Sequence, residues 1–228
     1  MTDAVLEPVR LALPFDGRWL TQNSPARRVP SHGTDLLGGR YAIDFVGVDD
    51  TNRSSARNDW RTALSTEPVQ RFFAFGRPIL APIDGTVVQV HDGEADHAAR
   101  RSQFALAGYA LGQAARLRAG VAAIAGNYVV LARDLGTYVA LVHLRRGTVE
   151  VTAGDHVATG QSLAECGNSG NSTQPHVHVQ AMDSLDFGAA QGLPIAFERY
   201  REWLRSDRQP HVRITGIPAE GAVVEPVA

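Results

Sequence analysis

The sequence contains no lysine, because all 22 of its basic residues are arginine. A pyridoxal Schiff base, a biotin or lipoyl attachment and the lysine of a phosphate-binding loop all require a lysine amine, so these chemistries are excluded. The chain also has a single cysteine, Cys166, which excludes an intramolecular disulfide. We expect this cysteine to be a small buried residue of the core.

Strong net charge and long hydrophobic runs are also missing. The formal net charge is −2 over 228 residues, so no excess of positive charge favours nucleic acid as a partner. No stretch approaches the ~20 apolar residues of a membrane span. The first residues lack the basic start and the apolar run of ~7–15 residues that a secretory signal needs. The sequence by itself therefore predicts a soluble protein of the cytoplasm.

Composition divides the chain into three expected regions. Residues 1–30 hold four prolines and show little periodicity, which predicts an extended N-terminal arm. Residues 31–200 hold most of the strand-like runs and are expected to form the main domain. Residues 201–228 are punctuated by proline and glycine, and we expect them to be a tail that packs on that domain.

Short β-rich runs separated by turns dominate the expected domain. RYAIDFVGV predicts a strand from Arg40, and PILAPIDGTVVQVH, GNYVVLARDLGTYVALVHL and PHVHVQAM predict further strands. Residues 96–121 are the exception, because Ala, Leu, Gln and Arg dominate there and predict an inserted amphipathic helix. The predicted fold class is therefore mainly β, a two-sheet antiparallel β-sandwich or barrel-like core with a helical insertion.

The most informative histidines are His176 and His178 in TQPHVHVQ. Alternate side chains of a strand point to the same face, so the two imidazoles lie side by side while Val177 and Val179 face the other way. A metal ion can be held at such a pair. A pair of polar surface histidines is the alternative that this motif alone leaves open.

Asp44 and His143 both stand in apolar strands. Asp44 alternates with Ile43 and Phe45, so its carboxylate leaves the opposite face of the sheet. It requires a partner there, because burial of an unpaired charge is very costly. Alternation puts His143 on the same face as Leu141, which suits a core histidine unless the strand end opens into a cleft.

Two imidazoles and one carboxylate are available if His32, from PSHGTDLLGG, joins Asp44 and His178. This ligand set suits a catalytic zinc ion (Zn2+) with an open fourth position for water. His143 and His176 then remain for proton transfer. The combination predicts a metal-dependent hydrolase.

Several blocks of the sequence resemble a single enzyme family. APIDGTVVQV, GNYVVL, YVALVHL and GDHVATGQSLAECGNSGNSTQPHVHV, with His32 and RYAIDF upstream, are similar to the lysostaphin-type zinc peptidases. These form the M23 family of β-lytic and LytM-like endopeptidases. The resemblance covers roughly residues 32–180 and implies the LytM-like form of the fold, a barrel-sandwich hybrid.

The resemblance also implies a role for each histidine of the site. The paired-histidine motif makes His178 a metal ligand and His176 a catalytic group, and the histidine of the apolar strand makes His143 a second catalytic group. In the family's first metal motif, three residues separate a histidine from an aspartate, but here position 36 is a leucine. Asp35 lies one position too early. We take Asp44 as the ligand, because RYAIDF resembles the equivalent strand of members with a longer loop.

The function that this resemblance implies is zinc-dependent hydrolysis of peptide bonds, with one zinc ion in the site. The expected partner is a peptide substrate, such as the stem or bridge peptides of bacterial peptidoglycan, and members of the family are usually exported. We expect a monomer. Two alternatives stay open: an inactive M23-like module that binds or regulates a partner, and a phosphocarrier-like hybrid sandwich that uses facing histidines without a metal.

Overall fold

The computed structural model describes residues 7–56, 65–100, 120–134, 136–205 and 207–227. Its regular elements are short strands, two 3-10 helices and one short α-helix within these ranges. They are β1 (Val9–Leu11), β2 (Trp19–Gln22), η1 (Leu36–Tyr41), β3 (Ile43–Gly47), η2 (Val69–Arg71), β4 (Pro78–Leu80), β5 (Gly85–His91), α4 (Val121–Ala125), β6 (Asn127–Asp134), β7 (Thr137–Leu144), β8 (His156–Val157), β9 (Ser162–Glu165), β10 (Val177–Met182), β11 (Gly192–Leu193), β12 (Ile195–Trp203), β13 (His211–Gly216) and β14 (Val223–Pro226).

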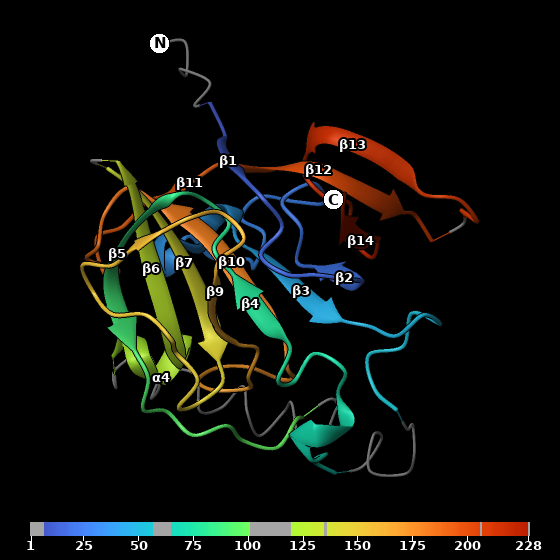
Figure 1. Cartoon of the computed structure of the whole chain (residues 1–228), viewed down its shortest axis with the longest axis horizontal. Helices are drawn as coiled ribbons and strands as arrows, with labels where there is room; N and C mark the ends of the chain where they lie inside the picture. The colour runs from blue at the N-terminus through green and yellow to red at the C-terminus, as the bar shows by residue number, and fades with distance from the viewer. Residues whose placement is uncertain (1–6, 57–64, 101–119, 135, 206, 228) are drawn as a thin grey trace.

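The strands form one large sheet and one small sheet, which confirms the predicted mainly β, two-sheet fold class. The large sheet has 12 strands in the order β1-β12-β14-β2-β3-β10-β7-β6-β5-β8, with β11 beside β10 and β13 beside β12. The small sheet pairs β4 with β9. All named pairs are antiparallel except β1 with β12, which is parallel. Figure 1 shows β5 and β6 toward one side of the molecule and β12, β13 and β14 toward the other.

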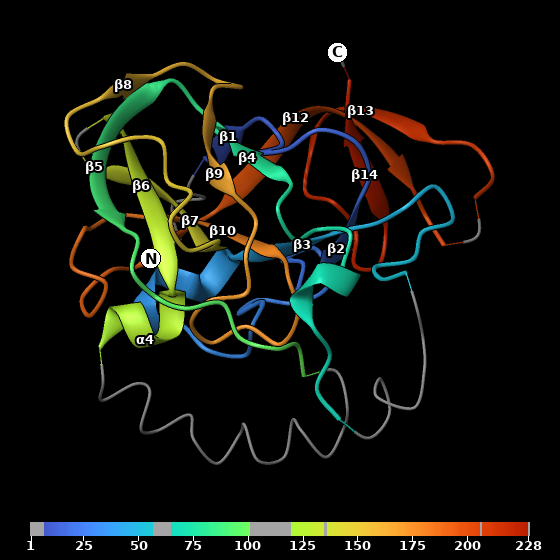
Figure 2. The same ribbon diagram turned by 60° about the horizontal axis from the view of Figure 1, so that its bottom comes forward.

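Both ends of the chain add strands to the large sheet. The first thirty residues, expected to be an extended arm, contribute β1 and β2 (Figure 2). The region after residue 200, expected to be a tail, contributes β13 and β14, and β12 runs across that boundary. β2 pairs with β3, so N-terminal residues lie next to the strand that carries Asp44.

The core lies between the two sheets and follows the alternation of the central strands. Val129, Leu131, Val139, Leu141 and Val179 belong to one buried cluster, which also takes in Ile79 and Leu163 from the small sheet. The intervening positions form a second cluster on the other face of the large sheet, with Tyr128, Val130, Ala140, Val142 and Met182. The large sheet therefore carries apolar side chains on both faces.

The strand predicted from Arg40 begins later than expected. Residues Arg40 and Tyr41 belong to the 3-10 helix η1, and β3 starts at Ile43. The carbonyl of Arg40 accepts a hydrogen bond from the backbone N–H of Ser31, and Ala42 donates to Gly39. This backbone is therefore tied to its local turn rather than to a neighbouring strand. The predicted start of the strand was wrong, because β-rich composition does not reveal these local hydrogen bonds.

The helix predicted over residues 96–121 falls mostly on residues 101–119, outside the described part of the chain. The described neighbouring segments are an irregular stretch before it and the short helix α4 after it. Among the described residues, no helix is both long enough and apolar enough to cross a membrane.

Candidate metal centre

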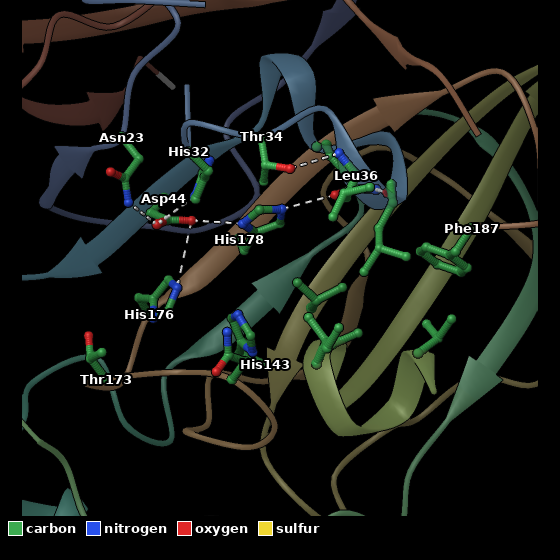
Figure 3. Close-up of a pocket in the computed structure, with 18 residues that line it drawn as sticks. Asn23, His32, Thr34, Leu36, Asp44, His143, Thr173, His176, His178 and Phe187 are labelled. Carbon is green, nitrogen blue, oxygen red and sulfur yellow. Dashed lines mark hydrogen bonds and ion pairs between the residues drawn. The ribbon is translucent and has the colours of Figure 1, made fainter. Parts of the chain in front are cut away.

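His32, Asp44 and His178 converge on one face of the large sheet, as Figure 3 shows. Asp44 lies on β3 and His178 on β10, and the register of these strands pairs the two residues directly. His32 lies in the turn that precedes η1. One potential ligand atom from each residue lies within 4.8 Å of the other two. A single ion can therefore contact all three side chains.

The Asp44 carboxylate is at the centre of this group. Its Oδ2 lies 3.0 Å from Nε2 of His32, and its Oδ1 lies 2.9 Å from Nδ1 of His178. The side-chain amide of Asn23 donates a hydrogen bond of 2.7 Å to Oδ2. Burial by itself would raise the pKa of Asp44, but the imidazoles of His176, His32 and His178 outweigh burial and hold the pKa well below its ordinary value. Asp44 is therefore a buried anion.

Gln180 presents a hydrogen-bond acceptor to Nε2 of His178. The Gln180 amide nitrogen donates to the carbonyl of Leu37 at 2.8 Å, so its oxygen Oε1 faces the His178 ring. Nε2 of His178 lies 3.0 Å from that oxygen and donates to it. If the ring is neutral and carries this proton, Nδ1 presents a lone pair toward Asp44; if both nitrogens are protonated, Nδ1 donates to Asp44.

His32 is oriented in the same way by its neighbour Ser31. The Ser31 hydroxyl donates to the carbonyl of Gly39 at 3.5 Å and lies 2.9 Å from Nδ1 of His32, whose N–H it can accept. Nε2 of His32, the nitrogen 3.0 Å from Asp44, then carries the lone pair. Such outer partners are typical of metal-binding histidines.

The arrangement fits a divalent cation. Two imidazole nitrogens lie 2.9 and 3.0 Å from one carboxylate, so each contact needs either a proton between its two atoms or one cation shared by all three groups. Two nitrogens and one oxygen also match the donor set of catalytic zinc sites. The three residues therefore fit zinc both in chemistry and in spacing.

His143 reaches the same face because of an irregularity in β7. Simple alternation predicts that it shares a face with Leu141, and this is wrong. The β6–β7 register shifts next to His143, whose φ is 66°, and Leu144 instead joins the main core. A bulge of this kind re-aims a side chain. The imidazole of His143 therefore packs beside that of His176, with ring centres 4.7 Å apart.

His143 and His176 both direct one N–H away from the metal ligands. Nδ1 of His143 donates to the carbonyl of Ser169 at 2.9 Å, and Nδ1 of His176 donates to the carbonyl of Gln174 at 2.8 Å. Burial, together with the neighbouring imidazoles of His176 and His178, holds the pKa of His143 well below its ordinary value. His143 is therefore neutral at pH 7, with its Nε2 unprotonated.

His176 differs from the prediction in one respect. The paired-histidine motif predicts both residues within one strand, but β10 begins at Val177, and His176 lies just before it. Its Nδ1 contacts Gln174 and Ser172 within the preceding loop, which replaces strand pairing there. Nε2 of His176 still lies 3.6 Å from Oδ1 of Asp44.

Asp35, the alternative carboxylate, lies outside the group. It forms an ion pair of 2.8 Å with Arg40, and its side chain is 58% exposed. Sequence reasoning also missed the supporting residues Asn23, Ser31 and Gln180. A signal existed for Gln180, because it follows His178 by two positions on a strand and so shares its face.

A mainly β fold that presents a carboxylate, two candidate ligand imidazoles and two further imidazoles on one sheet face has the components of a metallohydrolase. The model of peptidase family M23 matches residues 105–194, a stretch that includes His143, His176 and His178. The match confirms the resemblance to family M23 and supports a peptidase role.

Solved structures similar to this chain include three M23 proteins. The catalytic domain of the antimicrobial peptidase lysostaphin from Staphylococcus simulans is 19% identical, with 78% of this chain and 88% of that chain covered and a TM-score of 0.38. The catalytic domain of the prophage-encoded protein EnpA from Enterococcus faecalis, crystallised as a mutant, is 18% identical, with 67% and 73% covered and a TM-score of 0.39. The deep-sea metalloprotease pseudoalterin is 13% identical, with 91% and 92% covered and a TM-score of 0.44.

Proposed function

We propose that this protein is a zinc-dependent endopeptidase in which His32, Asp44 and His178 hold the metal. The observation that carries the proposal is the contact of Asp44 with imidazole nitrogens of both His32 and His178. Gln180 and Ser31 take the proton of each ring on its far side. With those protons on the far side, the two rings turn lone pairs toward the negative charge of Asp44, and this arrangement favours a cation.

Zinc held by His32, Asp44 and His178 would supply a Lewis acid for the scissile carbonyl and would lower the pKa of a bound water molecule to about 7. His143 supplies a neutral imidazole whose Nε2 accepts a proton, because Ser169 holds its Nδ1–H. His176, whose Nδ1 contacts the carbonyl of Gln174, presents its Nε2 as a second group for proton transfer. These two residues take up the proton of the attacking water and return it to the leaving amine.

The proposed substrates are peptide cross-links of bacterial peptidoglycan, as the M23 resemblance implies. Support from this chain comes from the position of the ligands, which line a pocket with a cavity volume of about 440 Å3. A cavity of this volume falls in the ~300–1,000 Å3 range of ligand pockets. The cavity is thus large enough to hold a short segment of peptide chain.

The phosphocarrier alternative is disfavoured by the charge at the centre of the site. Oδ1 of Asp44 lies within 3.6 Å of Nε2 of His176 and 2.9 Å of Nδ1 of His178. A phosphoryl group on either ring would stand against a buried carboxylate, and like charges at this separation repel strongly at low dielectric. The same carboxylate attracts a metal cation.

The proposal is tested by metal analysis of protein purified without chelator, followed by hydrolysis assays on peptidoglycan and on short peptides. We expect one zinc ion per chain and hydrolysis that stops with chelator and resumes with added zinc. His178→Ala should lose the zinc. His143→Ala should keep the zinc and lose hydrolysis by ~10²–10⁴-fold, as expected for removal of a proton-transfer group.

His156→Ala is the matched control, because His156 is exposed and lies outside the metal centre. This variant should keep both zinc and activity. Absence of tightly bound zinc from the unmodified protein contradicts the proposal. Stoichiometric zinc without any hydrolysis would instead support the inactive binding module.

A further inference from the structure

The pocket beside the metal ligands is chemically divided. On one side lie the polar residues of the metal centre, and on the other lie apolar side chains from four parts of the chain. They include Leu36 and Leu37 of η1, Ile124 of α4, Val142 of β7 and Phe187. In Figure 3 the labelled Leu36 and Phe187 lie on the side of His178 away from Asn23.

The apolar side is continuous with the metal centre. Val142 is the direct cross-strand partner of His178 in the β7–β10 pair, so their side chains are neighbours on one face of the sheet. Val142 and Phe187 also belong to the second buried cluster, so this side of the pocket is backed by packed apolar side chains. An occupant held against these side chains is therefore adjacent to the reacting centre.

Leu36 and Leu37 form the rim of the apolar side, and they differ from ordinary buried leucines in backbone conformation and in exposure. Leu37 adopts a left-handed backbone conformation with φ of 58°, which is uncommon for a leucine. Leu36 next to it is 59% exposed, although it is a large hydrophobic residue at the pocket edge. An apolar group that enters the pocket would cover part of this exposed surface.

The described lining of the apolar side disfavours a charged substrate side chain. Among the described lining residues, the only ionisable side chains are His32, Asp44, His143, His176 and His178 of the metal centre. A charged substrate side chain placed on the apolar side would lose its hydration without gaining a partner. A glycine would leave the apolar surface uncovered.

We infer that this pocket selects a bulky, uncharged apolar side chain, such as that of leucine or phenylalanine, on a residue next to the scissile peptide bond. The inference rests on the proposed function for the position of that bond. It makes Ile124, Val142 and Phe187 specificity-determining residues, and it replaces the peptidoglycan cross-links named above with apolar peptides as the preferred substrate class.

The first test uses the unmodified zinc-loaded protein and a series of quenched fluorescent peptides. The peptides differ only at one residue beside the cleaved bond, which is Gly, Ala, Leu, Phe, Asp or Arg, and each side of the bond is sampled in turn. On one side we expect kcat/KM for Leu or Phe to exceed that for Gly, Asp and Arg by about tenfold or more. Equal rates, or a preference for Gly or Ala on both sides, overturn the inference.

The second test reverses the preference with Ile124→Glu. A carboxylate on the apolar side should lower kcat/KM for the Leu peptide and raise it for the Arg peptide, while the zinc content stays at one per chain. Ile214→Glu is the matched control, because Ile214 is 72% exposed on β13 and does not line the pocket. Its Leu-to-Arg ratio should equal that of the unmodified protein.

Binding of the same peptides, labelled at one end and followed by fluorescence anisotropy, separates the two proposals. If no peptide is cleaved but the Leu and Phe peptides bind about tenfold more tightly than the Gly peptide, the endopeptidase proposal fails and the pocket inference stands. If peptides are cleaved without side-chain preference, the pocket inference fails alone. Absence of both cleavage and selective binding overturns both.

Discussion

At the scale of single residues, the proposed metal centre depends on groups that do not themselves face the metal position. Gln180 accepts the Nε2–H of His178, and its own orientation is set by its hydrogen bond to the Leu37 carbonyl. A neutral His178 without this acceptor is free to place its proton on Nδ1, where it would hydrogen-bond to Asp44 rather than bind a cation. Gln180 is thus a positioning residue.

Gln180→Leu should therefore weaken zinc binding without removing a ligand. We expect an increase in the zinc dissociation constant of ~10–100-fold, the usual effect of removing an outer partner of a metal-bound histidine. Competition with a chromophoric chelator measures it. Gln180→Glu, which retains an acceptor, should restore most of the affinity.

Gln70→Leu is the control for this measurement, because Gln70 is exposed in η2 and does not line the pocket. A purely structural role for Gln180 would lower thermal stability and leave zinc affinity unchanged. That result would contradict the assignment.

At the scale of elements, two irregular backbone segments hold the proposed catalytic side of the site. The bulge at His143 turns its imidazole out of the core, and its Nδ1 is then held by the carbonyl of Ser169. Ser169 lies in a loop that packs against the end of α4. Gly126 and Gly170 meet at this contact, both with positive φ, and Asn171 donates to the carbonyl of Ile124 at 2.7 Å. One contact thus supports both His143 and the apolar side of the pocket.

Gly170→Ala tests this contact against Gly160→Ala. Both glycines have positive φ, of 66° and 87°, so each substitution should cost ~1–2 kcal/mol of unfolding free energy from backbone strain alone. A Cβ at Gly170 would also overlap the Gly126 nitrogen and the Ile124 carbonyl oxygen, whereas nothing lies within 4 Å of one at Gly160. We expect Gly170→Ala to lose about 1–3 kcal/mol more in denaturant unfolding.

The two glycine variants should also differ in their rate of peptide hydrolysis. Gly170→Ala should lower peptide hydrolysis, because the loop that holds His143 must shift, and Gly160→Ala should leave it unchanged. Equal losses of stability in the two variants would contradict this prediction, because they would show that the Gly126–Gly170 contact can accommodate a methyl group.

At the scale of the whole molecule, the candidate ligands join distant parts of the chain. Asp44 and His178 are separated by 134 positions, and β3 and β10 bring them together at the centre of the large sheet. β1, β2 and β14 extend that sheet with residues from both ends of the chain. An ion bound at the three ligands would link the N-terminal and C-terminal halves, so metal binding and global stability are expected to be coupled.

Chelation should accordingly lower the melting temperature. At zinc concentrations 100 times the dissociation constant, binding stabilises the native state by about 2.7 kcal/mol. For a chain of this size, that corresponds to a difference in Tm of about 5–10 °C between zinc-saturated and chelated protein. Differential scanning calorimetry measures it, and the difference should disappear in His178→Ala. An unchanged Tm in the parent protein would argue against a site shared by the two halves.

Local patterns were sufficient for the fold class and for the sheet face on which Asp44 and His178 lie. Turn residues between β-rich runs predicted a mainly β protein, and alternation predicted that Asp44 and His178 leave the core. These inferences succeeded because side-chain period and turn chemistry are set by neighbours within a few positions. The ordered blocks around the histidines carried the resemblance to family M23.

Only the tertiary structure decided how these residues meet. The pairing of Asp44 with His178 joins two strands that lie 134 positions apart, and the contact of Gln180 with Leu37 joins β10 to η1. The position of His32 beside Asp44 and the ion pair of Asp35 with Arg40 depend on how the chain folds around η1. The turn of His143 out of the core depends on a register shift that alternation cannot anticipate, because one extra residue in a strand reverses the face of every side chain after it. Strand register is a property of pairs of segments, and a single sequence does not record which segments pair.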